Sequence, residues 1–307
     1  MIAFLFPGQG SQAVGMGKAF HDSSKSARAV FEEANDALGF DLAGLIFEGP
    51  ETELALTANT QPAVLTASVA AAAACAERGL DPAITTGHSL GEYSALVVAG
   101  ALPFAEAVRV VRRRGELMQD AVPVGVGAMA AIMGMDLAAV EGVCAESANG
   151  EVVQVANVNS TGQVVIAGHR TAVERAVALA ASRGGKKSVM LPVSAPFHCA
   201  LMAPTAERLA PMLRGMTVAD PRIPVVRNVD AGVTRAGVDV TPFLLRQIAS
   251  PVRWTDCVRR LVDEGATSFV EVGPGRVLTG LLRRIVDGAR GLAVEDPAGL
   301  ERALAAG

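Results

Sequence analysis

The sequence predicts an α/β protein in which a mostly parallel sheet carries helices on both faces and a smaller ferredoxin-like unit is inserted. Short apolar runs alternate with longer amphipathic runs, as in successive parallel βα units. Near Pro123 this rhythm changes to the order of a split β-α-β-β-α-β unit. The chain has 307 residues, of which 50% are hydrophobic and 19% charged, so it can bury a sizeable core.

The first elements of the large unit follow from its apolar runs. Residues 2–6 are apolar and strand-length and run into Pro7-Gly8, which predicts the first strand. The alanine-rich residues 63–76 predict a slim buried helix, too short and too weakly apolar to cross a membrane. Residues 83–86 predict a second short strand, and a further helix begins near Gly91.

The insertion accounts for the middle of the chain. Its strands are predicted at residues 128–133, 152–157, 163–167 and 187–192, and its helices at residues 137–147 and 171–182. We therefore expect residues 127–192 to form a small ferredoxin-like subdomain and residues 1–126 and 193–307 to form the large one. In the last part we expect a strand at 223–228, a helix at 241–248, a strand at 268–272, a turn at 273–275 and a final helix from Arg276.

Composition excludes several classes of protein. The net charge is −4 and only 4% of residues are aromatic, which disfavours binding to nucleic acid. No basic segment followed by a long apolar one opens the chain, so we expect a cytoplasmic protein that does not enter a membrane. The four cysteines lie far apart without a C-x-x-C pair, which favours buried free thiols over a zinc or redox site.

Residues 87–91 (GHSLG) fit the G-x-S-x-G pattern between an expected strand and an expected helix. This context is typical of a nucleophile elbow, in which small neighbours allow a sharp turn that exposes the Ser89 hydroxyl. The large subdomain is therefore predicted to resemble an α/β-hydrolase. The alternative is a glycine-rich helix start with Ser89 as its N-cap.

A nucleophilic serine needs a base, and the chain has four histidines. His88 lies inside the elbow, where its side chain is expected to point away from Ser89. His21 lies in a polar run and His169 at a strand exit of the insertion. His198, in a proline-punctuated loop, is the remaining candidate, with a structural role as the alternative.

The first strand is followed by residues 7–13 (PGQGSQA), which have two interpretations. They could be a variant of the G-x-G-x-x-A dinucleotide fingerprint, but no clear acidic residue follows at the expected spacing. They could instead form an oxyanion-hole loop, with the backbone N–H groups of Gln9 and Leu90 directed at an acyl oxygen.

Arg114 is a charged residue on an apolar helix face. On the expected helix of residues 104–118, a 100° spacing places Arg114 among the apolar side chains and the other arginines opposite. A buried guanidinium needs an anionic or strongly accepting partner. That partner could be an internal carboxylate, or the carboxylate of a substrate held by two parallel hydrogen bonds.

Taken together, the motifs resemble the malonyl-CoA:acyl carrier protein transacylases of bacterial fatty acid synthesis, nearly from end to end. The resemblance rests on PGQGSQ at 7–12, GHSLGEYSAL at 87–96, Arg114-Gly115, GAMAAIMG at 127–134, GQVVIAG at 162–168, VSAPFHCALM at 193–202, NVDA at 228–231, Gln247 and EVGPGRVLTGL at 271–281. It implies that Ser89 is acylated and His198 is its base, with Gln247 helping to orient the histidine. It also implies that Arg114 binds the substrate carboxylate and that Gln9 and Leu90 supply the oxyanion donors.

The same resemblance implies two partners, malonyl-CoA and an acyl carrier protein, and a ping-pong transfer without metal or redox cofactor. We expect a monomer. Phe197 departs from many of these transacylases, which have serine there, and resembles polyketide-synthase acyltransferases, so the acceptor's pathway stays open. The rivals are a serine thioesterase, which would pass the acyl group to water, and a non-catalytic carrier-protein docking subunit.

Overall fold

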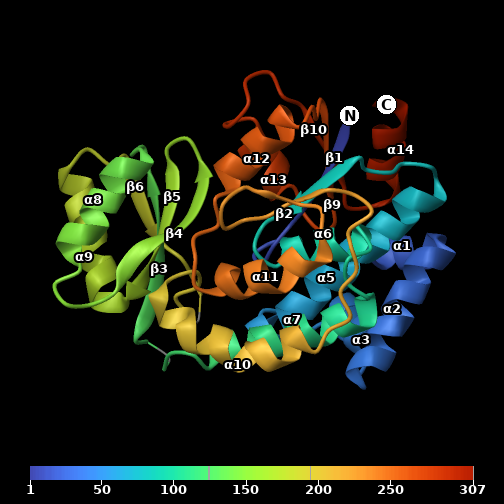
Figure 1. Ribbon diagram of the computed structural model, residues 1–307, viewed down its shortest axis with the longest axis horizontal. Helices are drawn as coiled ribbons and strands as arrows, with labels where there is room; N and C mark the ends of the chain where they lie inside the picture. Colours follow the sequence, from blue (N-terminus) through green and yellow to red (C-terminus); the bar gives the residue numbers. More distant parts are fainter. Residues whose placement is uncertain (124, 194, 307) are drawn as a thin grey trace.

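The computed structural model describes residues 1–123, 125–193 and 195–306 and contains two separate sheets (Figure 1). The larger sheet has the strand order β10-β9-β1-β2-β7-β8. Its strands are β1 (Ile2–Phe6), β2 (Ile84–Gly87), β7 (Val225–Val226), β8 (Val233–Thr234), β9 (Ser268–Val272) and β10 (Gly291–Val294). All its pairings are parallel except that of β7 with β8.

The central strand β1 shows why this sheet is covered on both sides. Phe4 and Phe6 point into the core on one face, whereas Ala3 and Leu5 point into a second core on the other. A strand buried on both faces is apolar throughout, as Ile2–Phe6 is.

Helices cover the two faces unequally. The Phe4 and Phe6 face carries most of the N-terminal helices, and the opposite face is covered mainly by α12 and α13. Outside the small sheet, the helices are α1 (Lys18–Ser23), α2 (Lys25–Leu38), α3 (Leu42–Glu48), α4 (Glu51–Leu54), α5 (Thr57–Glu77), α6 (Gly91–Val98), α7 (Phe104–Gln119), α10 (Ala203–Arg214), α11 (Val240–Ile248), α12 (Trp254–Asp263), α13 (Val277–Leu282) and α14 (Pro297–Ala306), with 3₁₀ turns η1 (Ala200–Met202) and η2 (Gly237–Asp239).

The alanine-rich helix α5 is almost entirely buried. The helix α7 approaches the start of α5 closely because Gly115 of α7 has no side chain: a Cβ there would lie 2.5 Å from the Thr57 carbonyl oxygen. Within the described residues, no helix is both long and apolar enough to span a bilayer.

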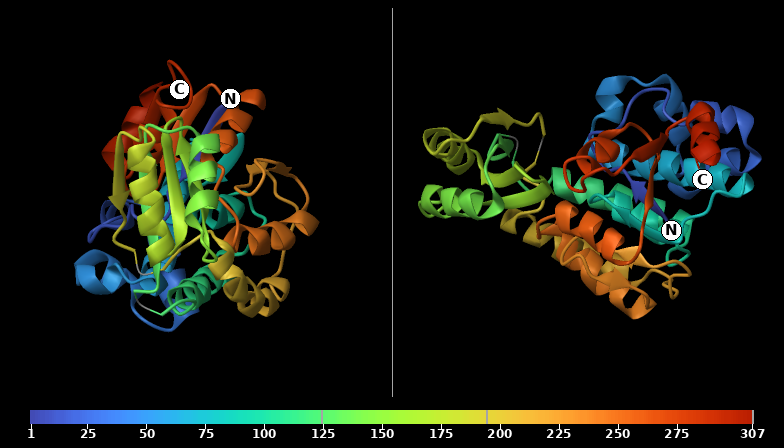
Figure 2. Two further views of the ribbon diagram at one scale, coloured as in Figure 1. Left: turned by 90° about the vertical axis from the view of Figure 1, so that its left-hand side faces the viewer. Right: turned by 90° about the horizontal axis from the view of Figure 1, so that it is seen from above.

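The second sheet is antiparallel, with the order β4-β5-β3-β6. Its elements follow one another as β3 (Gly127–Met133), α8 (Leu137–Ser147), β4 (Val153–Ser160), β5 (Gln163–His169), α9 (Arg170–Ser182) and β6 (Lys187–Met190), which is the ferredoxin-like order. Figure 2 shows this unit beside the larger one. The face of the sheet turned away from α8 and α9 packs on Cys199 and Phe197, close to the candidate base.

The predicted fold class is confirmed, and most predicted elements lie within a few residues of their observed bounds. Two expectations were wrong. The strand expected at 223–228 contains only Val225–Val226, because Asn228 turns its polar groups toward the elbow instead of a strand partner. The helix after the Gly273–Gly275 turn is not the last, since β10 and α14 follow. β10 is an edge strand of four residues, three of them only partly buried, and so short an apolar run does not identify a strand by its pattern.

Candidate active site

Ser89 lies at the turn from β2 to α6 and has a left-handed backbone, with φ 52°. A Cβ on Gly87 would lie 2.0 Å from backbone atoms of Gly91, and one on Gly91 would lie 2.1 Å from the Phe6 carbonyl oxygen. The two glycines are therefore required for this tight turn. The Ser89 N–H donates to Asn228 Oδ1 at 2.7 Å, which holds the strained residue in place.

His198 is brought to Ser89 from 109 residues away in the chain. Its Nε2 lies 2.7 Å from Ser89 Oγ, and its Nδ1 lies 3.0 Å from the backbone oxygen of Gln247. Burial, together with the nearby Arg114 charge, lowers the pKa of His198 to about 3. The imidazole is thus neutral at pH 7, and a proton on Nδ1 bonded to the carbonyl leaves the Nε2 lone pair facing the hydroxyl.

The other histidines bond elsewhere. His88 Nε2 lies 2.9 Å from Asn159 Oδ1 and its ring packs against Trp254, so it points away from Ser89 as expected. His169 Nδ1 accepts the Val152 N–H, and His21 pairs with the adjacent Asp22.

Arg114 is only 1% exposed and reaches the same hydroxyl. Its guanidinium donates to Gln61 Oε1 at 2.8 Å, to Gln247 Oε1 at 2.9 Å and to Ser89 Oγ at 3.2 Å. All three acceptors are uncharged, and no carboxylate in the described parts of the chain pairs directly with Arg114. Burial lowers its pKa, so an anion that entered the site would recover part of this cost.

The remaining predicted residues lie around this centre. The Gln247 side chain binds Arg114, whereas its backbone oxygen binds His198. The Gln9 side chain donates to Thr57 Oγ1 at 3.1 Å. The preceding residue, Gly8, packs against the His88 carbonyl. The backbone N–H groups of Gln9 and Leu90 have no hydrogen-bond acceptor among the described residues. Ser194, part of the His198 motif, lies outside those residues.

Sequence reasoning missed three buried residues of the site: Gln61, Glu92 and Asn228. Glu92 is 3% exposed, and its Oε2 accepts hydrogen bonds from the Asn228 N–H and from Gln247 Nε2. Burial raises its pKa to about 7. A sequence signal existed, because Glu92 is the one charged residue of the helix α6, just as Arg114 is the one charged residue on the apolar face of α7.

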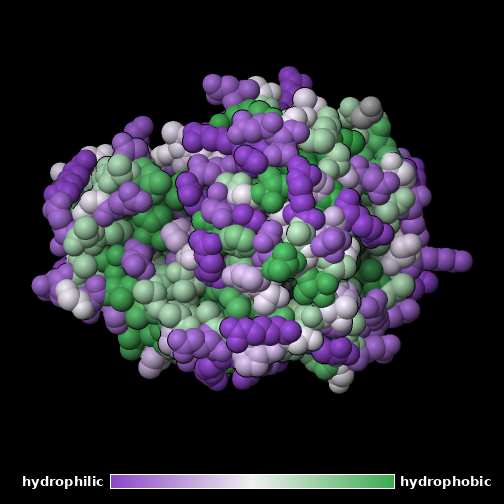
Figure 3. Space-filling model, viewed as in Figure 1, coloured by the Kyte–Doolittle hydropathy of each residue, from purple (hydrophilic) through white to green (hydrophobic). Residues whose placement is uncertain are grey.

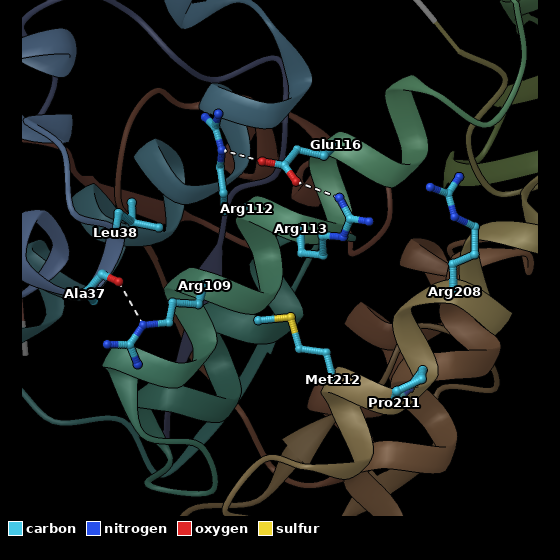
Figure 4. A pocket seen from close by; sticks show the side chains of 9 residues that line it. All are labelled: Ala37, Leu38, Arg109, Arg112, Arg113, Glu116, Arg208, Pro211 and Met212. Carbon is cyan, nitrogen blue, oxygen red and sulfur yellow. Dashed lines mark hydrogen bonds and ion pairs between the residues drawn. The ribbon is translucent and has the colours of Figure 1, made fainter.

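One hollow of the surface reaches the candidate site, and another lies apart from it. A cavity of about 400 Å³ lies where α8 and β4 meet His198 and Ser250, so the small sheet forms one wall beside the histidine. On the face in Figure 3, hydrophobic residues lie among hydrophilic ones. A groove of about 450 Å³ on the outer side of α7, with Arg109, Arg112 and Arg113, contains none of the candidate residues (Figure 4).

In the described part of the chain, no group of three His, Cys, Asp or Glu residues could hold a metal ion.

Comparison with known proteins decides the family. The profile of the acyl transferase domain matches residues 3–304. The chain belongs to the acyltransferase family. This acyltransferase is 50% identical over 304 residues to the malonyl CoA-acyl carrier protein transacylase of Escherichia coli K12, covering 99% of this chain and 98% of the relative.

Solved structures agree with that assignment. An acyl carrier protein S-malonyltransferase from Vibrio cholerae is 48% identical with a TM-score of 0.96, covering 98% of this acyltransferase and 99% of that chain. A malonyl-transacylase solved in complex with its type II PKS acyl-carrier protein is 46% identical with a TM-score of 0.97. The match covers 100% of this acyltransferase and 99% of that chain.

Proposed function

We propose that this acyltransferase moves a malonyl group from malonyl-CoA to the phosphopantetheine thiol of an acyl carrier protein, supplying extender units for fatty acid synthesis. The observation that carries the proposal is the arrangement at one oxygen: Ser89 Oγ lies 2.7 Å from a neutral imidazole and 3.2 Å from a buried guanidinium. The first contact suits a nucleophile and the second suits a substrate with a carboxylate.

The chemistry has two balanced steps. In the first, Ser89 Oγ attacks the thioester carbonyl while His198 Nε2 takes the hydroxyl proton; the C–S bond breaks and the CoA sulfur leaves with that proton. In the second, His198 takes the proton of the carrier's thiol, whose sulfur attacks the serine ester, and Ser89 leaves reprotonated. The free N–H groups of Gln9 and Leu90 are assigned to the oxyanion of both steps.

Arg114 supports malonyl as the acyl group. Its bonds to Gln61 and Gln247 fix the guanidinium, and uncharged acceptors leave its positive charge for a substrate carboxylate. When the serine ester forms, the malonyl carboxylate would replace Ser89 Oγ as the third acceptor of the Arg114 guanidinium.

The test is intact-mass analysis of the protein after exposure to malonyl-CoA and then to holo acyl carrier protein. We expect a malonyl adduct that disappears as the carrier gains the same mass. Release of the adduct to water without carrier would instead indicate a thioesterase, and the absence of any adduct would indicate a docking subunit. Parallel assays with fatty acid and polyketide carriers would identify the acceptor.

Replacing His198 by alanine should slow acylation by about 10²–10⁴-fold, the typical loss for a positioned general base. Intact-mass analysis of samples quenched at successive times after mixing with malonyl-CoA measures the rate of adduct formation. His169→Ala is the matched control, because the His169 ring accepts the Val152 N–H within the small unit. An acylation rate unchanged in His198→Ala would exclude it as the base.

We also propose that the small unit, residues 127–192, contributes to carrier docking through Lys186 and Lys187. Both are exposed where β6 begins. Transfer to an acidic carrier should therefore slow as salt rises, and Lys186→Glu with Lys187→Glu should slow it at low salt and flatten that dependence. The control, Lys18→Glu with Lys25→Glu, changes the net charge equally. If only the control pair alters the rate, the docking surface lies on the large unit.

A further inference from the structure

The buried carboxylate Glu92 has no part in the two chemical steps, yet it joins the elements that perform them. It lies three residues after the nucleophile on α6 and is, with Glu271, one of two buried acidic side chains in the described residues. Its Oε2 accepts the Asn228 N–H at 2.9 Å and Gln247 Nε2 at 2.8 Å.

The first of these bonds leads to the nucleophile. Asn228 Oδ1 accepts the Ser89 N–H at 2.7 Å, and Asn228 Nδ2 donates to the Gly87 carbonyl at 2.8 Å. Asn228 thus spans the elbow and stabilises the left-handed backbone of Ser89. Glu92 accepts the backbone N–H of Asn228, so through Asn228 it helps to fix the position of the Ser89 hydroxyl.

The second bond leads to the arginine. Gln247 Nε2 donates to Glu92 and, at 3.0 Å, to the Ser89 carbonyl, while its Oε1 accepts from Arg114 at 2.9 Å. A guanidinium can only donate, and Glu92 supplies an accepting oxygen on the other side of the amide. The amide can satisfy both neighbours in one orientation only.

We propose that Glu92 is a positioning residue that sets the acyl selectivity of the site. By fixing the Gln247 amide, it holds Arg114 through a neutral oxygen rather than through a direct ion pair. A carboxylate in direct contact would compete with the substrate's carboxylate for the guanidinium. With the Gln247 amide between them, Glu92 still attracts the Arg114 guanidinium, and this attraction offsets part of the cost of burying Arg114.

The inference rests on the proposed function and is tested by comparing malonyl-CoA with acetyl-CoA. Glu92→Ala should lower acylation by both substrates, because Ser89 loses support. It should lower kcat/KM for malonyl-CoA by at least about a further 10-fold, the effect of one charge-assisted hydrogen bond, because Arg114 also loses its fixed acceptor. The ratio of kcat/KM for malonyl-CoA to kcat/KM for acetyl-CoA therefore falls.

Glu92→Gln serves as the rescue variant and the safeguard against misfolding, because it keeps the side-chain shape and an accepting oxygen. It should recover most of the lost ratio. Glu271→Ala is the matched control: Glu271 is a buried acid that accepts two backbone N–H groups of α13, so its loss should lower Tm without changing the ratio. A folded Glu92→Ala whose ratio stays within about twofold of the parent, or a folded Glu92→Gln whose ratio collapses, overturns the proposal. Failure of the parent protein to form any malonyl adduct would instead reject the proposed function.

Discussion

Ser89→Ala should form no malonyl adduct while keeping the fold of the parent protein. The substitution removes one oxygen, the only atom of the site that attacks the thioester in the proposed route. The turn that carries residue 89 survives, because its main-chain N–H still donates to Asn228 and its neighbouring glycines still allow the close approach. The measurement is intact mass after incubation with malonyl-CoA.

Ser94→Ala is the matched control for this variant. Ser94 lies on α6, which follows the turn that carries Ser89; it is fully buried, and its hydroxyl has no hydrogen-bond partner among the described residues. It should acylate like the parent. A malonyl adduct that persists in Ser89→Ala would move the nucleophile to another side chain, and peptide mapping of that adduct would identify it.

The sequence was sufficient for the parts of the site that follow local rules. The elbow depends on small residues at fixed spacing, and Gly87 and Gly91 show the close approaches that this spacing implies. The burial of Arg114 follows from helical periodicity alone. Likewise, the ferredoxin-like unit follows from the order and lengths of its elements.

The parts that sequence reasoning missed depend on contacts between distant segments. Asn228 was assigned to the end of a strand, but its amide lies on the elbow, 139 residues earlier in the chain. Gln247 was expected to orient His198, and the structure shows that the contact is made by its backbone oxygen, a group that every residue has. Such a contact leaves no trace in the side-chain pattern.

Arg114→Ala should invert the substrate preference of this acyltransferase. Acetyl and malonyl groups differ by one carboxylate, and an apolar pocket disfavours the charged one because of its desolvation. In the proposed function Arg114 reverses this preference, because it is buried, held by uncharged oxygens and 3.2 Å from Ser89 Oγ. Removing one member of a buried ion pair costs about 3–5 kcal/mol, or roughly 10²–10⁴ in rate if the loss is expressed in the transition state.

We therefore expect kcat/KM for malonyl-CoA to fall steeply in Arg114→Ala, whereas that for acetyl-CoA holds or rises. Arg114→Met, which fills more of the vacated volume, should give the same ratio and separates lost charge from a collapsed pocket. Arg113→Ala is the control, because Arg113 lies on the solvent side of α7 and pairs with Glu116. If both substrates lose activity by a similar factor in both Arg114 variants, the guanidinium stabilises the site without selecting the acyl group, since a residue that only supports Ser89 affects every thioester alike.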